Sequence, residues 1–159
     1  MTAIGGRGRP VLDAATQIPV QGYVASLTVP NRVESVRPAT SFLVATSRAL
    51  NVPAAANPLF EVAVSEAITN AVKHGHKGEV RGAITCELEV APAALTVRVL
   101  DGGAGFRVPE PQFPPISDER LQALPESGYG LPIIHSVFPV VRAVKVNGRF
   151  GLELSLPLI

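Results

Sequence analysis

The sequence predicts an α+β fold, a two-layer α/β sandwich in which a mixed, mostly antiparallel sheet carries its helices on one face. Three observations predict it. Apolar and polar residues alternate in several short segments, two longer segments repeat apolar residues at helical spacing, and Asn147 with Gly148 joins two of the alternating segments. The chain has 159 residues, 47% of them hydrophobic, which is enough for one packed core.

The composition narrows the classes of partner. Only 17% of the residues are charged and the net charge is +1, which gives no broad basic surface for nucleic acid or for an anionic membrane. The single cysteine, Cys86, excludes an intramolecular disulfide framework and a cysteine-built zinc site, and it fits a reducing cytoplasm. No run reaches the roughly 18 consecutive apolar residues that span a bilayer. We therefore expect a soluble, cytoplasmic protein.

The chain is expected to begin with a flexible tail over residues 1–20, followed by one folded domain over residues 21–159. The tail is rich in Gly, Pro and small polar residues and has no periodicity. Its Arg7-Gly-Arg-Pro10 segment resembles the core of an AT-hook, but one short copy is weak support for DNA binding. The first strand is predicted from Tyr23 to Val29, ending at Pro30.

Two helices are expected next. Ser35 is the predicted N-cap of the first, which should stop at Asn51 and Pro53. The second has stronger boundary signals, because Asn57 can act as N-cap and proline is favoured at the first helical position. This helix is predicted to cover Pro58 to His74.

Two paired strands with one buried face are predicted after the second helix, over residues 84–90 and 95–99. The proline-rich segment 106–126 is longer than an ordinary connection, which suggests a functional loop or lid. A helix is expected over residues 131–137. The Asn147-Gly148 hairpin then joins a strand over residues 140–146 to a last strand over residues 150–156, at or next to a sheet edge.

Two polar residues of the second helix are candidates for a chemical role. Glu66 and Asn70 lie one turn apart on a partly apolar face, away from the side of Glu61, Ser65 and Thr69. A carboxylate on a dry face needs a partner, a cation or a chemical task. Carboxylate and carboxamide oxygens one turn apart suit Mg²⁺, which takes its other ligands from water and phosphate. The alternative is a capped or salt-bridged helix face, with Lys73 as the partner.

Two glycine-rich turns follow along the chain. Asp101 comes directly after a buried-type strand and opens the run Asp101-Gly-Gly-Ala-Gly105, which permits close approach of a ligand. An aspartate at a strand end can accept hydrogen bonds, as an adenine amino group requires. Ser127-Gly-Tyr-Gly130 opens the next helix, and glycine N–H groups at a helix N-terminus bind anions. Each run alone is equally typical of a simple turn, and neither is a Rossmann or P-loop motif.

In combination, three motifs resemble the N box and the two glycine boxes of the GHKL (Bergerat-fold) ATPases in order and spacing. They are Glu66-Ala-Ile-Thr-Asn70-Ala-Val-Lys-His-Gly75, Asp101-Gly-Gly-Ala-Gly105 and Gly128-Tyr-Gly130-Leu131. Within that superfamily the chain most resembles the anti-sigma-factor serine kinases of the RsbW and SpoIIAB type. The resemblance covers about Leu27 to Leu156.

The resemblance implies ATP and Mg²⁺ as cofactors and a role for each matching residue. Glu66 would orient or deprotonate the attacking hydroxyl, Asn70 would ligate Mg²⁺, and Asp101 would recognise the adenine amino group. Segment 106–126 would be the ATP lid. The remaining nucleotide contacts implied are Lys73, Gly103, Gly105, Ser127, Gly128, Tyr129, Gly130 and Leu131.

The sequence departs from the family pattern at two places. Gly151 is followed by Leu152, where relatives often carry a small hydroxyl residue near the adenine. Phe138-Pro139 stands where relatives commonly have an acidic residue. Neither departure touches Glu66 or Asn70.

The resemblance implies an enzyme: an ATP-dependent anti-sigma regulatory factor, a serine/threonine protein kinase that phosphorylates an anti-anti-sigma protein, sequesters a sigma factor and forms a homodimer. The alternative is a non-catalytic ATP-binding module that grips its partner in a nucleotide-dependent way. A sensor histidine kinase is disfavoured because no dimerisation helix with a phosphoacceptor histidine precedes the domain. A metal site at His74 and His76 is disfavoured because no further Cys or His lies at ligand spacing.

Overall fold

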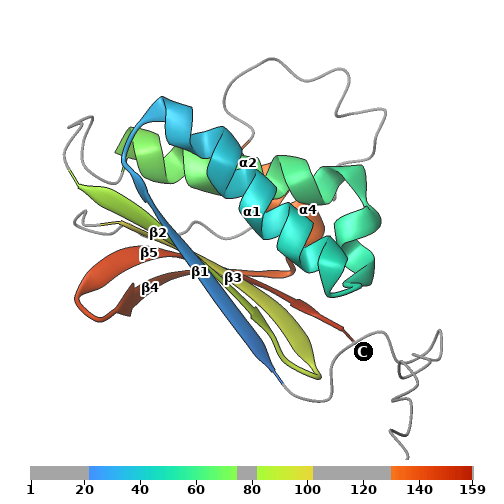
Figure 1. The fold of residues 1–159 in the computed structure, drawn as a ribbon. Helices are drawn as coiled ribbons and strands as arrows, with labels where there is room; N and C mark the ends of the chain where they lie inside the picture. Colours follow the sequence, from blue (N-terminus) through green and yellow to red (C-terminus); the bar gives the residue numbers. More distant parts are fainter. Residues whose placement is uncertain (1–21, 75–81, 102–129, 159) are drawn as a thin grey trace, which may run out of the picture.

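The computed structural model describes residues 22–74, 82–101 and 130–158. In this part of the chain three α-helices lie on one face of a five-stranded sheet (Figure 1). The strands are β1 (Tyr23–Pro30), β2 (Ala83–Val90), β3 (Ala94–Asp101), β4 (Val140–Val146) and β5 (Arg149–Pro157). The helices are α1 (Val36–Ala49), α2 (Pro58–His74) and α4 (Gly130–Val137), with short 3₁₀ turns η1 (Val33–Ser35) and η2 (Pro53–Ala56).

The sheet has the strand order β1-β2-β3-β5-β4. All four pairings between the described strands are antiparallel, which is simpler than the mixed sheet expected from the sequence. The last strand, β5, lies next to the edge strand β4, as expected. The two-layer α+β architecture is confirmed, with the described helices on one face of the sheet.

The turn between β4 and β5 confirms the hairpin prediction. Asn147 and Gly148 both have positive φ angles, of 50° and 78°. Positive φ at both central residues is the requirement of a type I′ turn, whose twist matches that of the strands it joins. Strand β5 extends one residue beyond the predicted limits at each of its ends, and β4 has the predicted limits.

Helix α1 begins and ends differently from a simple capped helix. Ser35 occupies the N-cap position, but its side chain makes no capping hydrogen bond, so the capping prediction is wrong. The reason is that η1 precedes α1 and already gives Ser35 a helical backbone. At the other end Asn51 has a φ of 56°, and Val52 N–H donates to the Ser47 carbonyl at 3.0 Å. Asn51 therefore ends the helix in a Schellman motif.

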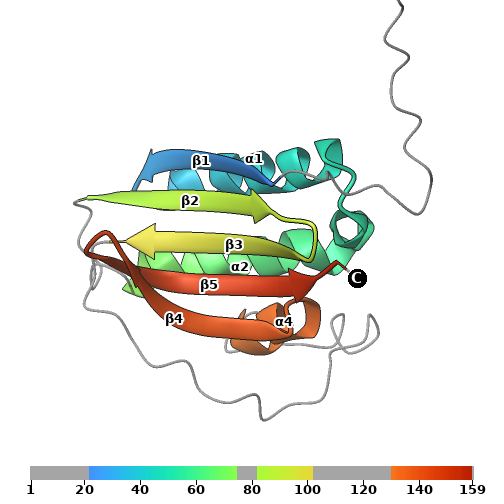
Figure 2. The same cartoon turned by 90° about the horizontal axis from the view of Figure 1, so that it is seen from below.

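Helix α2 has the boundaries that the sequence predicts. The side-chain oxygen of Asn57 accepts a hydrogen bond from Leu59 N–H at 3.0 Å, so Asn57 caps the helix. In the helix layer α2 lies between α1 and α4 and contacts both of them (Figure 2). It is therefore the central helix above the sheet.

One hydrophobic core fills the space between the sheet and the helices. The rings of Phe60 and Phe138 are both fully buried and lie 5.7 Å apart, which joins α2 to the end of α4. Cys86 is a buried core residue, and burial raises the pKa of its thiol to about 12, so the thiol stays protonated. The sheet contributes the alternate residues Ile84, Cys86, Leu88, Val90, Leu95, Val97, Val99, Leu152, Leu154 and Leu156.

The opposite face of the sheet is polar and is held by ion pairs. Glu153, on β5, is 6% exposed and accepts hydrogen bonds from Arg98 Nε at 2.8 Å and Arg142 Nε at 2.6 Å. Arg98 also donates to Glu89 at 3.0 Å, so the network crosses β2, β3, β5 and β4. Burial alone would raise the pKa of Glu153, but the hydrogen bonds from Arg142 and Arg98 outweigh it and lower the pKa.

Gly151 lets β5 approach β3 closely. A Cβ atom at this position would lie 1.9 Å from the Val99 carbonyl oxygen and 2.8 Å from Leu100 Cα. We expect Gly151→Ala to lower the free energy of unfolding by about 3 kcal/mol, at the upper end of typical overpacking costs. Urea denaturation measures the change.

Gly148→Ala is the matched control for this substitution. No atom lies within 4 Å of a Cβ built there, so only the positive φ opposes the change, at about 1 kcal/mol. Equal losses in the two variants would contradict the close approach of β5 to β3.

Candidate functional site

The candidate site lies at the end of the sheet where β3 finishes. The C-terminal end of α2 and the β4–β5 turn lie at this same end of the molecule (Figures 1 and 2). Arg149 holds the sheet together here, because its guanidinium reaches across β3 and donates to Thr85 Oγ1 and to the Ala83 carbonyl on β2. The residues that the sequence singles out on α2 and β3 thus belong to neighbouring parts of the fold.

Glu66 and Asn70 lie on the border of the buried face of α2. Both side chains are half-buried, next to a row of buried alanines at positions 63, 67 and 71. Within the described ranges Glu66 takes part in no ion pair, and Lys73 is exposed. The alternative of a Glu66–Lys73 salt bridge therefore has no support in the described part of the chain.

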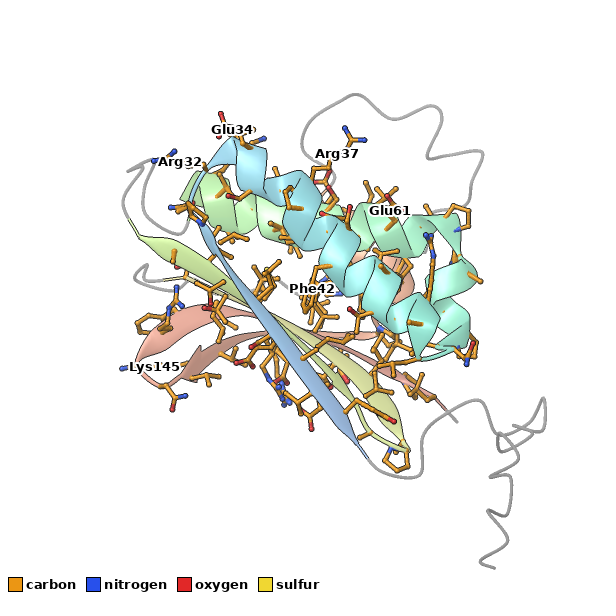
Figure 3. The ribbon with its side chains drawn as sticks, in the orientation of Figure 1. Arg32, Glu34, Arg37, Phe42, Glu61 and Lys145 are labelled. Carbon is orange, nitrogen blue, oxygen red and sulfur yellow. The ribbon has the colours of Figure 1, made fainter. Side chains whose placement is uncertain are left out.

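The expected water face of α2 is only partly correct. Glu61 is exposed (Figure 3). Its carboxylate lies 3.6 Å from the guanidinium of Arg48. Ser65 and Thr69, predicted to share this face, are half-buried, and the Thr69 hydroxyl donates to the Ser65 carbonyl at 2.8 Å. The difference arises because α2 has helices on both sides and the sheet below, so more of its surface is covered than a helix with one buried face would have.

Asp101 is the last residue of β3 and is only 6% exposed. It lies two residues after Val99, which belongs to the core, so its side chain is on the helix-covered side of the sheet. A buried carboxylate at a strand end, on the face that α2 covers, is well placed to accept hydrogen bonds from a ligand. The strand-end position of Asp101 agrees with the sequence prediction, and its contact with adenine stays a prediction.

Several predicted site residues lie outside the described residues: Gly75, His76, Gly103, Gly105, Ser127, Gly128 and Tyr129, as do the tail 1–20 and the lid 106–126. Those expectations stay predictions. Helix α4 begins at Gly130, one residue earlier than predicted. Leu131 is half-buried against the core.

The residues present fit a magnesium ion that is held mainly by a nucleotide. No three His, Cys, Asp or Glu side chains gather as a metal site in the ranges that the structure describes. Asn70 offers one hard oxygen ligand at a half-buried position, with the Glu66 carboxylate one turn away. Mg²⁺ commonly takes one or two protein ligands and completes its octahedron with water and phosphate oxygens.

The sequence patterns do not indicate a role for two residues at this end of the sheet. Phe150 pairs directly with Asp101 in the β3–β5 register, and Lys145 pairs with Phe150 in the β4–β5 register. The Asn147-Gly148 turn already implies that Lys145 and Phe150 are neighbours. The pairing with Asp101 depends on the sheet order, which the sequence pattern does not contain.

No helix in the described part of the chain is long and apolar enough to cross a membrane.

A family match that agrees with the fold identifies the class of protein. Over residues 29–156 the sequence matches the family of histidine kinase-like ATPase domains, and the chain belongs to that family. It is similar to the serine-protein kinase RsbW of Oceanobacillus iheyensis, with 29% identity over 99 residues, which is 60% of this chain and 61% of that protein. A shorter match, to RsbW of Listeria innocua, has 54% identity over 46 residues and covers 29% of each chain.

The anti-sigma F factor of Clostridium acetobutylicum is another relative, 30% identical over 89 residues, which is 56% of this chain and 61% of that protein. The chain thus spans 61% of the length of two of these relatives and 29% of the third.

Proposed function

We propose that this protein is an ATP-dependent anti-sigma regulatory factor that acts as a serine/threonine protein kinase. The observation that carries the proposal is the buried Asp101 carboxylate, which faces the helix layer at the end of the sheet where α2 also ends. Membership of the ATPase domain family and the names of the relatives support it. The protein would act in the cytoplasm.

In the proposed site Asp101 accepts a hydrogen bond from the amino group of adenine. Asn70 would hold Mg²⁺, which when bound neutralises phosphate charge, and Lys73, one turn further along α2, would contact the nucleotide. Glu66 orients the attacking hydroxyl and accepts its proton. The serine oxygen then bonds to the γ-phosphorus, the bond from that phosphorus to the β–γ bridging oxygen breaks, and ADP leaves.

The proposed phosphoacceptor is a serine of an anti-anti-sigma protein, and the proposed target of sequestration is a sigma factor. The names of the relatives support this pair of partners, because they include both a serine-protein kinase and an anti-sigma factor. We also propose that the protein acts as a homodimer. Incubation of the wild-type protein with ATP labelled at the γ-position and the candidate anti-anti-sigma protein should give labelled phosphoserine. Nucleotide-dependent binding of that partner without any labelled phosphoserine would instead support the non-catalytic module.

Asp101→Asn tests the nucleotide site itself. Loss of a hydrogen bond to a charged group costs about 1.5–3 kcal/mol, so ATP affinity should fall by about tenfold to hundredfold. Isothermal titration calorimetry measures the dissociation constants, and circular dichroism checks that the variant is folded.

Glu34→Gln is the control, because it makes the same change from carboxylate to carboxamide at an exposed position of η1 (Figure 3). Its ATP affinity should equal that of the wild type. An Asp101→Asn variant with wild-type affinity would show that Asp101 does not recognise the base.

A further inference from the structure

We propose that Phe150 forms one wall of the base-binding part of the nucleotide site and that Lys145 holds the Phe150 ring in place. The inference rests on the proposed function and adds a base-contacting residue and a positioning residue to it. Neither residue belongs to the three motifs that first indicated nucleotide binding.

The three side chains form one row across the sheet. Asp101, Phe150 and Lys145 are direct partners in the registers of β3 with β5 and of β5 with β4. Side chains at directly opposite positions have Cβ atoms about 4.5–5.5 Å apart. Phe150 therefore lies between the Asp101 carboxylate and Lys145.

The row is on the helix-covered side of the sheet. Asp101 follows Val99 by two positions and Phe150 precedes Leu152 by two, and both Val99 and Leu152 are core residues. The register of β3 with β5 places Phe150 opposite Asp101 at the end of β3. A base that is hydrogen-bonded to Asp101 would thus have an aromatic ring as its neighbour.

The Phe150 ring is only half-buried, unlike Phe60 and Phe138, which the core covers fully. The ammonium group of Lys145 lies 5.1 Å from the ring centroid, within the range of a cation–π contact. Lys145 itself is exposed at the β4–β5 end of the sheet (Figure 3). Because β4 is on the far side of β5 from β3, Lys145 approaches the ring from the side away from Asp101.

This arrangement fits a purine better than it fits a phosphate group. Stacking of a base on an aromatic ring needs an accessible ring and is worth about fivefold to a hundredfold in affinity. The lysine is occupied by the ring and separated from Asp101 by one strand. We therefore assign the base contact to Phe150 and the positioning of the ring to Lys145.

The test measures how well adenosine and inorganic tripolyphosphate displace a fluorescent ATP analogue from the full chain. Phe150→Ala should weaken ATP and adenosine by the same factor, about fivefold to a hundredfold, and leave tripolyphosphate unchanged. Phe150→Leu keeps most of the apolar volume without the aromatic face, and it should show the same pattern with a smaller factor. Thermal melts identify a variant that fails to fold, and in that case Phe150→Leu alone decides the outcome.

Lys145→Met should weaken the binding of ATP and of adenosine together by about twofold to fivefold. Lys145→Arg should keep both affinities at the wild-type level, because arginine also makes cation–π contacts. The matched control is Tyr23→Ala, an aromatic residue 50% exposed at the opposite end of the sheet, which should change no affinity. Loss of tripolyphosphate binding in Lys145→Met would overturn the positioning assignment and make the lysine a phosphate ligand.

The outcomes separate this inference from the proposed function. A wild-type chain that binds no ATP would overturn the proposed function itself. Wild-type ATP binding that Asp101→Asn weakens, together with unchanged adenosine affinity in the folded Phe150 variants, would overturn only the assignment of Phe150.

Discussion

Replacing Glu66 with glutamine is expected to lower phosphoryl transfer to the partner serine by about 10²- to 10⁴-fold, the usual contribution of a positioned general base. The carboxamide keeps the size of the side chain and removes its ability to accept the hydroxyl proton. Glu66 is half-buried on the side of α2 that borders the core, so a residue of equal volume should preserve the packing. ATP affinity should stay unchanged, because base recognition is assigned to Asp101.

Single-turnover transfer of labelled phosphate to the partner measures the rate, and calorimetry measures ATP binding in the same variant. The matched control is Glu61→Gln, on the same helix but exposed and paired with Arg48 at the surface. An exposed pair of this kind contributes little to stability, so the Glu61→Gln variant should be as stable as the wild type. Because Glu61 has no proposed part in phosphoryl transfer, the variant should also keep the wild-type rate. If Glu66→Gln transferred phosphate as fast as the wild type, Glu66 would not be the base.

Replacing Phe60 with alanine is expected to lower the free energy of unfolding by about 3–5 kcal/mol. Its ring is fully buried, and the contact with Phe138 at 5.7 Å joins α2 to the segment that follows α4. Removal of the ring leaves a cavity between two helices and the sheet, which such rigid elements fill only partly. Urea denaturation followed by circular dichroism measures the loss.

Phe42→Ala makes the same chemical change in α1, where the ring is half-buried against the core (Figure 3). Its cost should be below about 2 kcal/mol, since part of the ring already contacts water. Equal costs at the two positions would contradict the placement of Phe60 at the centre of the core.

The elements that could be predicted are those whose ends have local chemical signals. Helix α2 runs from Pro58 to His74 as expected because Asn57 caps it, and the β4–β5 turn forms because Asn147 and Gly148 accept positive φ. These signals act over a few residues and need no tertiary contact. The prediction for Ser35 was wrong because the preceding 3₁₀ turn supplied a helical backbone in place of a cap.

The candidate-site residues that belong to a sequence motif could be predicted. The residue that strand pairing brings to the site could not. Asp101, Glu66 and Asn70 were found from residue type and spacing. Phe150 has no such signal, because its place beside Asp101 arises from a pairing between strands far apart in the sequence. The half-burial of Ser65 and Thr69 also depends on neighbouring elements, because α2 packs against both α1 and α4, which a single helical period does not represent.

The ion pairs of the open sheet face have a consequence for the site on the other face. Glu153 is held by arginines from both neighbouring strands, Arg98 on β3 and Arg142 on β4. A slip of β5 by one residue would turn Glu153 into the core and expose the leucines beside it, and it would also separate both ion pairs. The ion-pair network thus stabilises the observed register of β5 against a register shifted by one residue. Because alignment also decides which residue stands beside Asp101, charges on the open face help to determine the shape of the proposed nucleotide site on the other face.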